Sequence, residues 1–292
     1  MKIYGGDGKD WGSWDPKTDY PWYSLDFKST KEVRSTIFNN LINNKMFSFV
    51  RFGDGPLGYV DDMNHRWHPE DEKIKNEFIK NFKKIDDYDQ DDFMVGIPMD
   101  TPEMSDGLIS PITSIRQCWK SMNKYLDLKR KYFAHNAIHS MFVCEYKMTV
   151  DFLNLVKSKK VCIVGNERYP IEVLNYLYGD VHHVKVPYIN AFYSHESITN
   201  EVIKQQKENN FDVILFAASF ATYPTMVNLF EKLNNSVTMI DIGSTIDPFV
   251  NDYYDVRATP QGNVVTHSGK RGWWITDYTD FVSNIKKIIG NQ

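Results

Sequence analysis

The sequence predicts an α/β protein with a Rossmann-like, mostly parallel sheet that is covered by helices on both faces. In the second half of the chain, segments typical of strands alternate with segments typical of helices. Strand segments such as VCIVG (161–165) and VILFA (213–217) are apolar throughout, which indicates strands buried on both faces of a parallel sheet. With 292 residues, of which 42% are hydrophobic, the chain can bury a large core.

The first half of the chain shows the same alternation. A capping-box pair, Ser29 and Glu32, predicts a helix over 29–44. Pro69 and the acidic residues that follow it predict the first turn of a second helix. The apolar residues that mark the buried sides of these helices are Val33, Ile37, Leu41, Ile74, Phe78 and Phe82. The strands expected here are FSFVRF (47–52) and FMVGIP (93–98).

The later elements follow in order along the chain. After VCIVG, the expected strands are HVKVP (183–187), VILFA (213–217) and VTMIDIG (237–243). The expected helices are marked by Ile171 to Leu177, by Ile198 and Val202, by Met226 to Leu233 and by Asp277 to Ile289. Weaker patterns indicate helices around Ile112 to Met122 and over 135–155. No linker divides the chain, so we expect an aromatic N-terminal arm, 1–28, on a single domain, 29–292.

Composition and charge narrow the function classes. A net charge of −4 argues against a protein built mainly to hold a nucleic acid backbone, which usually carries a basic excess. The three cysteines have no metal-like spacing, which favours reduced thiols and a cytoplasmic protein. The first residues have no apolar core typical of a signal peptide, and no apolar stretch reaches the about 20 residues that span a bilayer. The sequence leaves open whether the protein forms a homo-oligomer.

Polar residues follow the predicted strands at the points where they end. In a doubly wound sheet, ligands bind beyond the carboxyl ends of the strands. The residues that follow the strands include Arg51, Gly53, Asp54, Gly55, Asn166, Arg168, Asn190, His195, Ser219, Asp241, Gly243 and Asp247. This pattern is typical of a nucleotide or phosphate site, although any α/β protein shows part of it.

The Gly-Asp-Gly segment after FSFVR is the most specific of these features. Glycines let the backbone turn tightly and approach a ligand closely. The carboxylate of Asp54 could take a divalent cation, and Arg51 could hold a phosphate through a bidentate contact. An ordinary turn, with Asp54 capping its own backbone and Arg51 in a surface ion pair, is the alternative.

Other candidate sites carry less signal. The chain has no Walker-type phosphate loop, no G-x-G-x-x-G after a strand and no G-x-S-x-G elbow. His135 and His139 could share a helix face, but a zinc pair would need a further ligand, so we favour two structural or exposed histidines. The acidic segment DDYDQDD (86–92) lacks the glycine and glutamate of a calcium loop, so we favour a solvated loop.

Four stretches together resemble the GT-D-type glycosyltransferases, bacterial enzymes that move a sugar from a nucleotide-sugar donor to an acceptor. The family segment R-F-G-D-G-E reads R-F-G-D-G-P at 51–56. The family's strand, proline, Asn-Ala-Phe and acidic residue match VPYINAFYSHESI (186–198), and a strand, small-residue turn and helix match ILFAASFATYPTMVNLF (214–230). A strand that ends in Asp-Ile-Gly, with a later Asp, matches 241–247. Order and spacing agree over about residues 30–250.

The resemblance implies a Rossmann-like sheet, a nucleotide-sugar donor (often UDP-linked) and a divalent cation, Mn²⁺ or Mg²⁺. In the family, the Asp and Glu of G-D-G-E form an Asp-x-Glu metal motif. Asp54 matches the first position, whereas Pro56 stands at the second and has no ligating side chain. A substitute ligand could come from Asp61, Asp62, Asp100 or Asp247.

The resemblance also implies roles for the strand-end residues. Arg51 and Arg168 are candidates to stabilise the leaving diphosphate. Asp54, His195, Glu196 and Asp247 are the catalytic candidates, the last three as the base for the acceptor hydroxyl. The donor-binding candidates are Arg51, Gly53, Gly55, Asn166, Arg168, Asn190, Ser219, Asp241 and Gly243. The acceptor would be a glycan, a glycoprotein or a lipid-linked sugar. Two alternatives stay open, a non-catalytic nucleotide- or glycan-binding protein and a transferase that modifies DNA bases.

Overall fold

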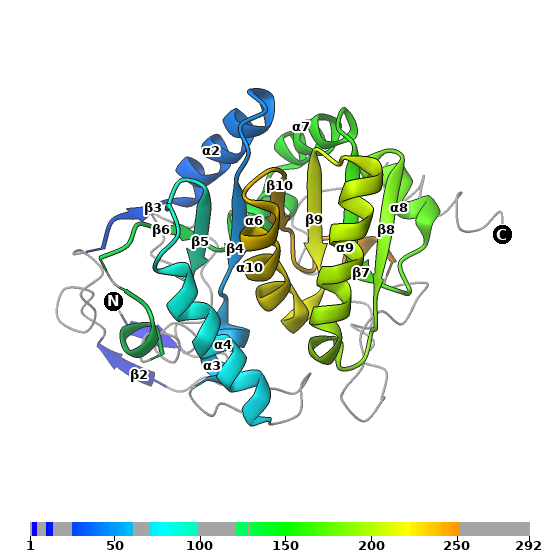
Figure 1. Ribbon diagram of the computed structural model, residues 1–292. Coiled ribbons are helices and arrows are strands. Elements are labelled where there is room, and N and C mark those ends of the chain that lie inside the picture. Colours follow the sequence, from blue (N-terminus) through cyan, green and yellow to red (C-terminus); the bar gives the residue numbers. More distant parts are fainter. Residues whose placement is uncertain are drawn as a thin grey trace.

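Eight parallel strands form one sheet at the centre of the protein. The computed structural model describes residues 2–4, 10–13, 25–60, 71–98, 121–127 and 129–250. The strands of the sheet are β3 (Phe27–Lys28), β4 (Ser48–Arg51), β5 (Phe93–Ile97), β6 (Tyr132–Ala134), β7 (Val161–Asn166), β8 (Val181–Val186), β9 (Val213–Ala217) and β10 (Thr238–Asp241). Their order across the sheet is β3-β6-β5-β4-β10-β9-β7-β8, and each pair of neighbours is parallel (Figure 1). The predicted α/β fold is therefore confirmed.

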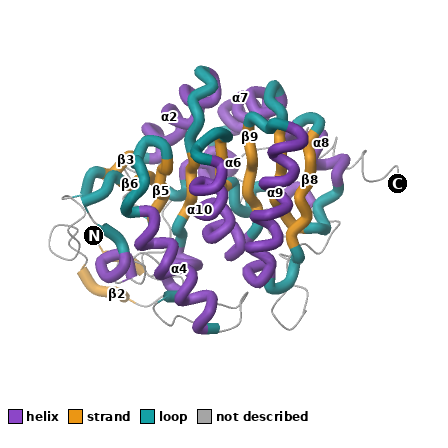
Figure 2. Tube along the Cα trace, viewed as in Figure 1, coloured by secondary structure: helices purple, strands orange, loops and turns teal. Residues whose placement is uncertain are grey.

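Helices cover both faces of this sheet, as Figure 2 shows. The α-helices are α2 (Thr30–Ile42), α3 (Asp54–Tyr59), α4 (Glu72–Ile85), α6 (Ala137–Cys144), α7 (Tyr146–Lys157), α8 (Ile171–Tyr178), α9 (His195–Asn209), α10 (Thr222–Leu233) and α11 (Asp247–Val250). Short 3-10 turns, η2 (Ala191–Ser194) and η3 (Ser219–Ala221), precede α9 and α10. A separate antiparallel pair, β1 (Lys2–Tyr4) and β2 (Asp10–Ser13), lies near the N-terminus.

Two hydrophobic cores separate the helices into layers. Helices α4, α9 and α10 pack on one face of the sheet, where Phe78 and Val202 share a core with Phe216. Helices α2, α6, α7 and α8 pack on the other face, where Ile37 and Phe152 share a core with Leu215. Since neighbouring side chains along a strand point to opposite faces, Leu215 and Phe216 of β9 serve different cores. This explains why the strands read as continuously apolar.

Several predicted boundaries need correction. The last two residues of the predicted arm, 27–28, pair with β6 and so form the edge strand of the sheet. The helical region predicted over 135–155 is confirmed and holds two helices, because α6 ends at Cys144 and α7 begins at Tyr146. Strands β3 and β6 were not predicted, because their short lengths leave no periodicity in the sequence. The predicted helix at Asp277 to Ile289 lies outside the described residues.

The capping-box prediction is confirmed at the start of α2. The Ser29 hydroxyl accepts the backbone N–H of Glu32 at 3.4 Å, and the Glu32 carboxylate accepts the backbone N–H of Ser29 at 2.8 Å. These contacts satisfy donors that the helix itself leaves unpaired. Within the described part of the chain, no helix is long and apolar enough to cross a membrane.

The parallel arrangement places every strand's carboxyl end at one edge of the sheet. In Figure 1 this is the lower edge, where α3 follows β4. Strands β4 and β10 are neighbours in the middle of the sheet, with Phe49 opposite Ile240. Here the half built from β3 to β6 meets the half built from β7 to β10.

Candidate functional site

Arg51 and Asp241 meet where the two halves of the sheet join. Arg51 ends β4 and Asp241 ends β10, so strand pairing brings them together from opposite ends of the chain. The Nε atom of Arg51 lies 3.5 Å from Oδ2 of Asp241, and the backbone N–H of Arg51 donates to the same oxygen at 3.3 Å. Burial raises the pKa of the Asp241 carboxyl, whereas the Arg51 guanidinium and the surrounding backbone N–H groups oppose this rise.

Gly243 completes this arrangement from the turn after β10. Its backbone N–H donates to Oδ1 of Asp241 at 2.8 Å. Its φ is +54°, in the left-handed region that favours glycine. A Cβ at this position would also overlap the guanidinium of Arg51 at Nη2. Gly243 therefore leaves the space that the arginine side chain fills.

The Nη groups of the Arg51 guanidinium are N–H donors that a ligand could contact. Among the described residues, its one polar side-chain contact is the ion pair between Nε and Asp241. The Arg51 side chain is 16% exposed, whereas that of Asp241 is 3% exposed. A guanidinium offers several N–H donors in a plane, an arrangement that suits phosphate oxygens. Asp241 thus holds one edge of the guanidinium, and the Nη edge can bind an anion.

The Gly-Asp-Gly segment begins a helix. Gly53 is the N-cap of α3, and Asp54, Gly55 and Pro56 form its first turn. This position accounts for Pro56, because the first N–H groups of a helix have no partner within the helix and a proline there loses no bond. The side chain of Asp54 lies outside the described residues.

His135 lies beside this segment, although its sequence context predicted a structural or exposed histidine. It follows β6, and its backbone N–H donates to the carbonyl of Ile97 at 3.3 Å. A Cβ added at Gly53 would lie 3.5 Å from Cδ2 of His135. Since β6 was not predicted, no signal in the sequence placed His135 at a strand end.

Arg168 belongs to a second group, at the ends of β7 and β8. Its backbone N–H donates to the Asn166 side-chain oxygen at 2.9 Å, and its guanidinium stacks 3.5 Å from the ring centre of Tyr188. Strands β10 and β9 separate β4 from β7, which corresponds to roughly 14 Å at the usual strand spacing. Arg51 and Arg168 therefore belong to two distinct groups along the same edge.

Asp247 is buried and anchored. Its side chain is 5% exposed, and its Oδ1 accepts the hydroxyl of Tyr169 at 2.5 Å. Tyr169 follows β7 and Asp247 opens α11, so this bond ties together two connections on the same edge of the sheet. The arrangement favours an anchoring role for Asp247 over that of a base for a solvent-borne hydroxyl.

The remaining candidates follow β8 and β9. Asn190 and Ser219 have left-handed φ angles of 54° and 52°. Asn190 precedes the turn η2, Ser219 opens the turn η3, and these two turns pack against each other.

His195 begins α9, and its carbonyl accepts the Thr225 hydroxyl of α10 at 3.4 Å. Burial lowers the pKa of His195, against the opposing pull of Glu77 and Glu196. Of the catalytic candidates, Glu196 is exposed and His195 is partly buried.

Comparison with known proteins identifies the fold. No family model and no curated protein matches the sequence. A solved structure described as the highly conserved domain of unknown function 1792, with a distinct glycosyltransferase fold, matches with a TM-score of 0.60 and 17% identity, over 89% of this chain and 94% of that chain. Another, described as a new glycosyltransferase from Streptococcus sanguinis, matches with a TM-score of 0.57 and 15% identity, over 89% and 97%. The chain has this glycosyltransferase fold. The match supports the fold that the resemblance implied. The comparison does not show the R-F-G-D-G motif in these neighbours.

The glycosyltransferase fold raises the question of a metal ion, which the resemblance placed on Asp54. Among the described residues, no three His, Cys, Asp or Glu side chains come together as a metal site. Asp241 is already occupied by Arg51 and by the Gly243 N–H. Three further predicted ligands, Asp61, Asp62 and Asp100, lie outside the described residues. The described donors do not fit a divalent cation, so no step proposed below depends on one.

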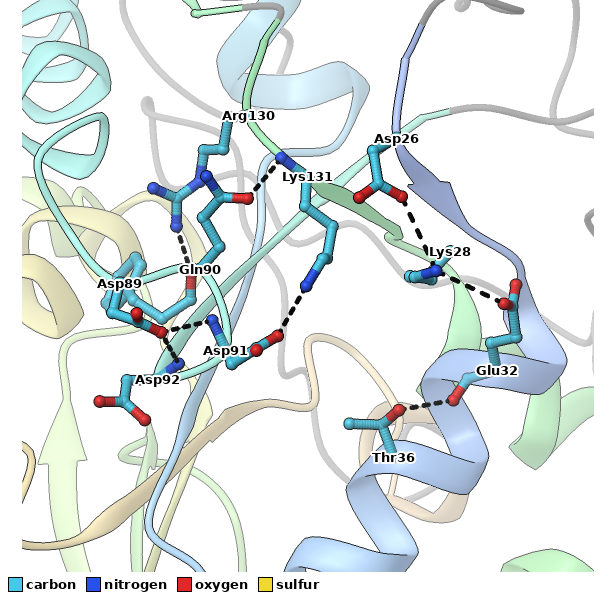
Figure 3. A network of polar contacts seen from close by, with 11 residues as sticks. Asp26, Lys28, Glu32, Thr36, Asp89, Gln90, Asp91, Asp92, Arg130 and Lys131 are labelled. Atoms are coloured by element: carbon cyan, nitrogen blue, oxygen red, sulfur yellow. Dashed lines mark hydrogen bonds and ion pairs between the residues drawn. The ribbon is translucent and has the colours of Figure 1, made fainter.

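The acidic segment 86–92 lies at the opposite edge, before β5, and Figure 3 shows how its side chains are used. Oδ1 of Asp89 accepts the backbone N–H groups of Asp91 and Asp92 at 2.9 and 3.2 Å. Asp91 pairs with Lys131 at 2.9 Å, and Arg130 donates to the carbonyl of Tyr88 at 2.9 Å. These contacts hold the acidic segment as a structured loop.

Proposed function

We propose that the protein is a glycosyltransferase that uses a nucleotide-sugar donor, with a UDP-linked sugar as the first candidate. The observation that carries this proposal is the Arg51 guanidinium, held by Asp241 and Gly243 at the centre of the sheet's carboxyl edge. In open α/β sheets ligands bind at this edge. The glycosyltransferase fold supports the same assignment.

Arg51 would stabilise the leaving diphosphate. In the transfer, the bond between the anomeric carbon and the phosphate oxygen breaks, and a new bond forms to the acceptor oxygen. The acceptor's proton passes to a base, and the nucleoside diphosphate leaves with the bonding electrons. Cationic donors fixed in advance stabilise the negative charge that develops on the leaving oxygen.

The group at β7 and β8 would hold the nucleoside. The roughly 14 Å between β4 and β7 suits an extended nucleoside diphosphate, with its phosphates at Arg51 and its base near Tyr188. An aromatic ring backed by a guanidinium is a surface on which a base can stack. Asn166 holds the Arg168 backbone in this group.

His195 is the proposed base for an acceptor hydroxyl. It lies at the start of α9, on the same edge as Arg51. Its lowered pKa keeps the imidazole neutral at neutral pH, as a base requires. The acceptor class that we propose is a glycan hydroxyl on a protein, lipid carrier or polysaccharide.

Calorimetric titration of UDP, once with manganese and once with EDTA, tests the proposal. We expect equal binding in both buffers, with affinity at least about ten-fold lower for Arg51→Gln, because a charge-assisted contact is lost. Lys207→Gln, an exposed cation on α9, is the control and should bind UDP like the natural chain. Absence of UDP binding in both buffers would overturn the proposal.

Two other outcomes distinguish the diphosphate-binding part of the proposal from its catalytic part. Binding that needs manganese would contradict the arginine-based clamp and return attention to Asp54. A screen of UDP-sugars for slow hydrolysis to UDP then addresses catalysis. UDP binding without hydrolysis or transfer of any donor would favour the non-catalytic alternative.

A further inference from the structure

His135 packs closely against Gly96, and its ring lies beside Gly53. Gly96 of β5 pairs with Arg51 of β4, and a Cβ at Gly96 would lie 2.9 Å from Cα and 3.3 Å from Cβ of His135. A Cβ at Gly53 would lie 3.5 Å from Cδ2 of the ring. Any larger residue at position 96 would displace His135. The ends of β4 and β5 therefore lie against His135, which follows β6.

The surroundings of the ring are electropositive. The charged and titratable groups that act on it are Arg51 of β4 and His139 of α6, which both disfavour its protonation. Burial is the main cause that lowers the pKa of His135 to about 3, and these two groups add to it against the opposing effect of the Ile97 carbonyl. The ring is therefore neutral at physiological pH, with one nitrogen that donates and one that accepts.

One ring nitrogen has no partner. The Nδ1 atom is buried and has no partner within hydrogen-bonding geometry among the described residues, although the nearby Ile97 carbonyl acts on the ring. An unpaired buried polar atom costs free energy unless a ligand or water satisfies it. The residue as a whole is only partly buried, so the ring lies at the margin of the core.

We propose that His135 is a second phosphate-binding residue, which acts with Arg51 on the diphosphate of a nucleotide. This inference rests on the proposed function and deepens it. A diphosphate carries negative charge that hydrogen-bond donors fixed in the site stabilise. A neutral imidazole can donate one hydrogen bond to a phosphate oxygen, and the Nη edge of Arg51 can donate others.

The first test is calorimetric titration of inorganic pyrophosphate, UDP and uridine into the natural chain and into His135→Gln. We expect affinity for pyrophosphate and UDP to fall by about ten-fold or more, the usual range for a hydrogen bond to a charged group. Uridine, which has no phosphate, should bind both proteins equally. His182→Gln, a partly buried histidine on β8, is the matched control and should change none of the three titrations.

A second measurement does not depend on a variant. The ring signals of His135 are followed by NMR over pH, with and without pyrophosphate. A phosphate against the ring favours the imidazolium, so the pKa of His135 should rise when pyrophosphate binds. Unmoved signals and an unmoved pKa, despite saturation with pyrophosphate, would overturn the inference.

The outcomes separate this inference from the proposed function. If UDP and pyrophosphate bind and need Arg51 but not His135, the inference is wrong and the proposed function stands. If pyrophosphate needs His135 but no nucleotide sugar binds or reacts, His135 is a phosphate ligand and the transferase proposal fails. If neither anion binds the natural chain, both fail.

Discussion

The guanidinium of Arg51 fills the space into which a side chain at Gly243 would project. One residue ends β4 and the other follows β10, so the fit links the two halves of the sheet. Any side chain at position 243 must displace the arginine that we assign to the diphosphate. The relationship gives a direct test of that assignment.

We expect Gly243→Ala to lose UDP binding as fully as Arg51→Gln does. Gly179→Ala is the matched control, because Gly179 also has a positive φ, of 88°, but contacts Lys157 instead of the site. Gly243→Ala should lose about 1–2 kcal/mol of stability from left-handed strain. Gly179→Ala should lose about 1–3 kcal/mol, because its φ of 88° and ψ of −161° lie in a region that essentially only glycine adopts. Only Gly243→Ala should lose UDP affinity, as measured by calorimetry. Equal affinity in both variants would contradict the role of Arg51.

Removal of Arg51 should produce a pH-dependent loss of stability. Burial holds the pKa of Asp241 above its ordinary value of 3.8, and Arg51 opposes this shift. In Arg51→Met the folded-state pKa of Asp241 should rise further. A carboxyl whose pKa is raised on folding contributes its full stability below its unfolded pKa and loses it as pH rises through the folded pKa.

The deficit of Arg51→Met relative to the natural chain should thus be small in acid and grow as pH rises above the folded-state pKa of Asp241 in the natural chain, which itself lies above 3.8, toward about 3–5 kcal/mol at neutral pH. Urea unfolding at several pH values measures this deficit. Because Asp241→Asn removes the buried charge, the double variant Arg51→Met/Asp241→Asn should show little of the pH dependence. A deficit that does not change with pH would refute the coupling.

Tyr169→Phe tests the anchoring of Asp247. Loss of the hydroxyl that donates to Oδ1 leaves a buried carboxylate short of a partner, which should cost about 1–3 kcal/mol in urea unfolding. A double-mutant cycle with Asp247→Asn isolates the pair, and we expect a coupling energy above about 0.5 kcal/mol. Additive losses would show that the bond adds nothing to stability.

The pH profile of transfer tests His195. Burial lowers the pKa of His195 below its ordinary value of 6.5. The value of kcat/KM should therefore stay level near neutral pH and fall only below pH 6.5. Glu77 raises this pKa, so Glu77→Gln should move the acidic limb to lower pH. His195→Gln should remove the limb together with most of the rate. An acidic limb that persists in His195→Gln would assign the base elsewhere.

Tyr188→Leu tests the division of the site. If the ring stacks on the base, this variant should weaken UDP binding by several-fold through the lost stacking, and leave pyrophosphate binding unchanged. Arg51→Gln should weaken both ligands. Calorimetry with the two ligands and the two variants distinguishes these patterns, and equal losses for both ligands in Tyr188→Leu would contradict a nucleoside subsite.

The sequence by itself determined the local features of this protein. The capping box at Ser29, the apolar runs of the central strands and the alternation of strands with helices all follow from short-range patterns, and together they predicted the α/β class. The same patterns placed Arg51 and Asp241 at strand ends. Pattern and propensity act over a few residues, which is why these predictions were within reach.

Only the tertiary structure decided which strand ends meet. Arg51 and Asp241 are 190 residues apart, and the order of the strands makes them neighbours while it separates Arg51 from Arg168. Packing buried Asp247 against Tyr169, and a strand too short to predict brought His135 to the glycines. Such contacts depend on strand order and on the space between side chains, and neither quantity leaves a local pattern in the sequence.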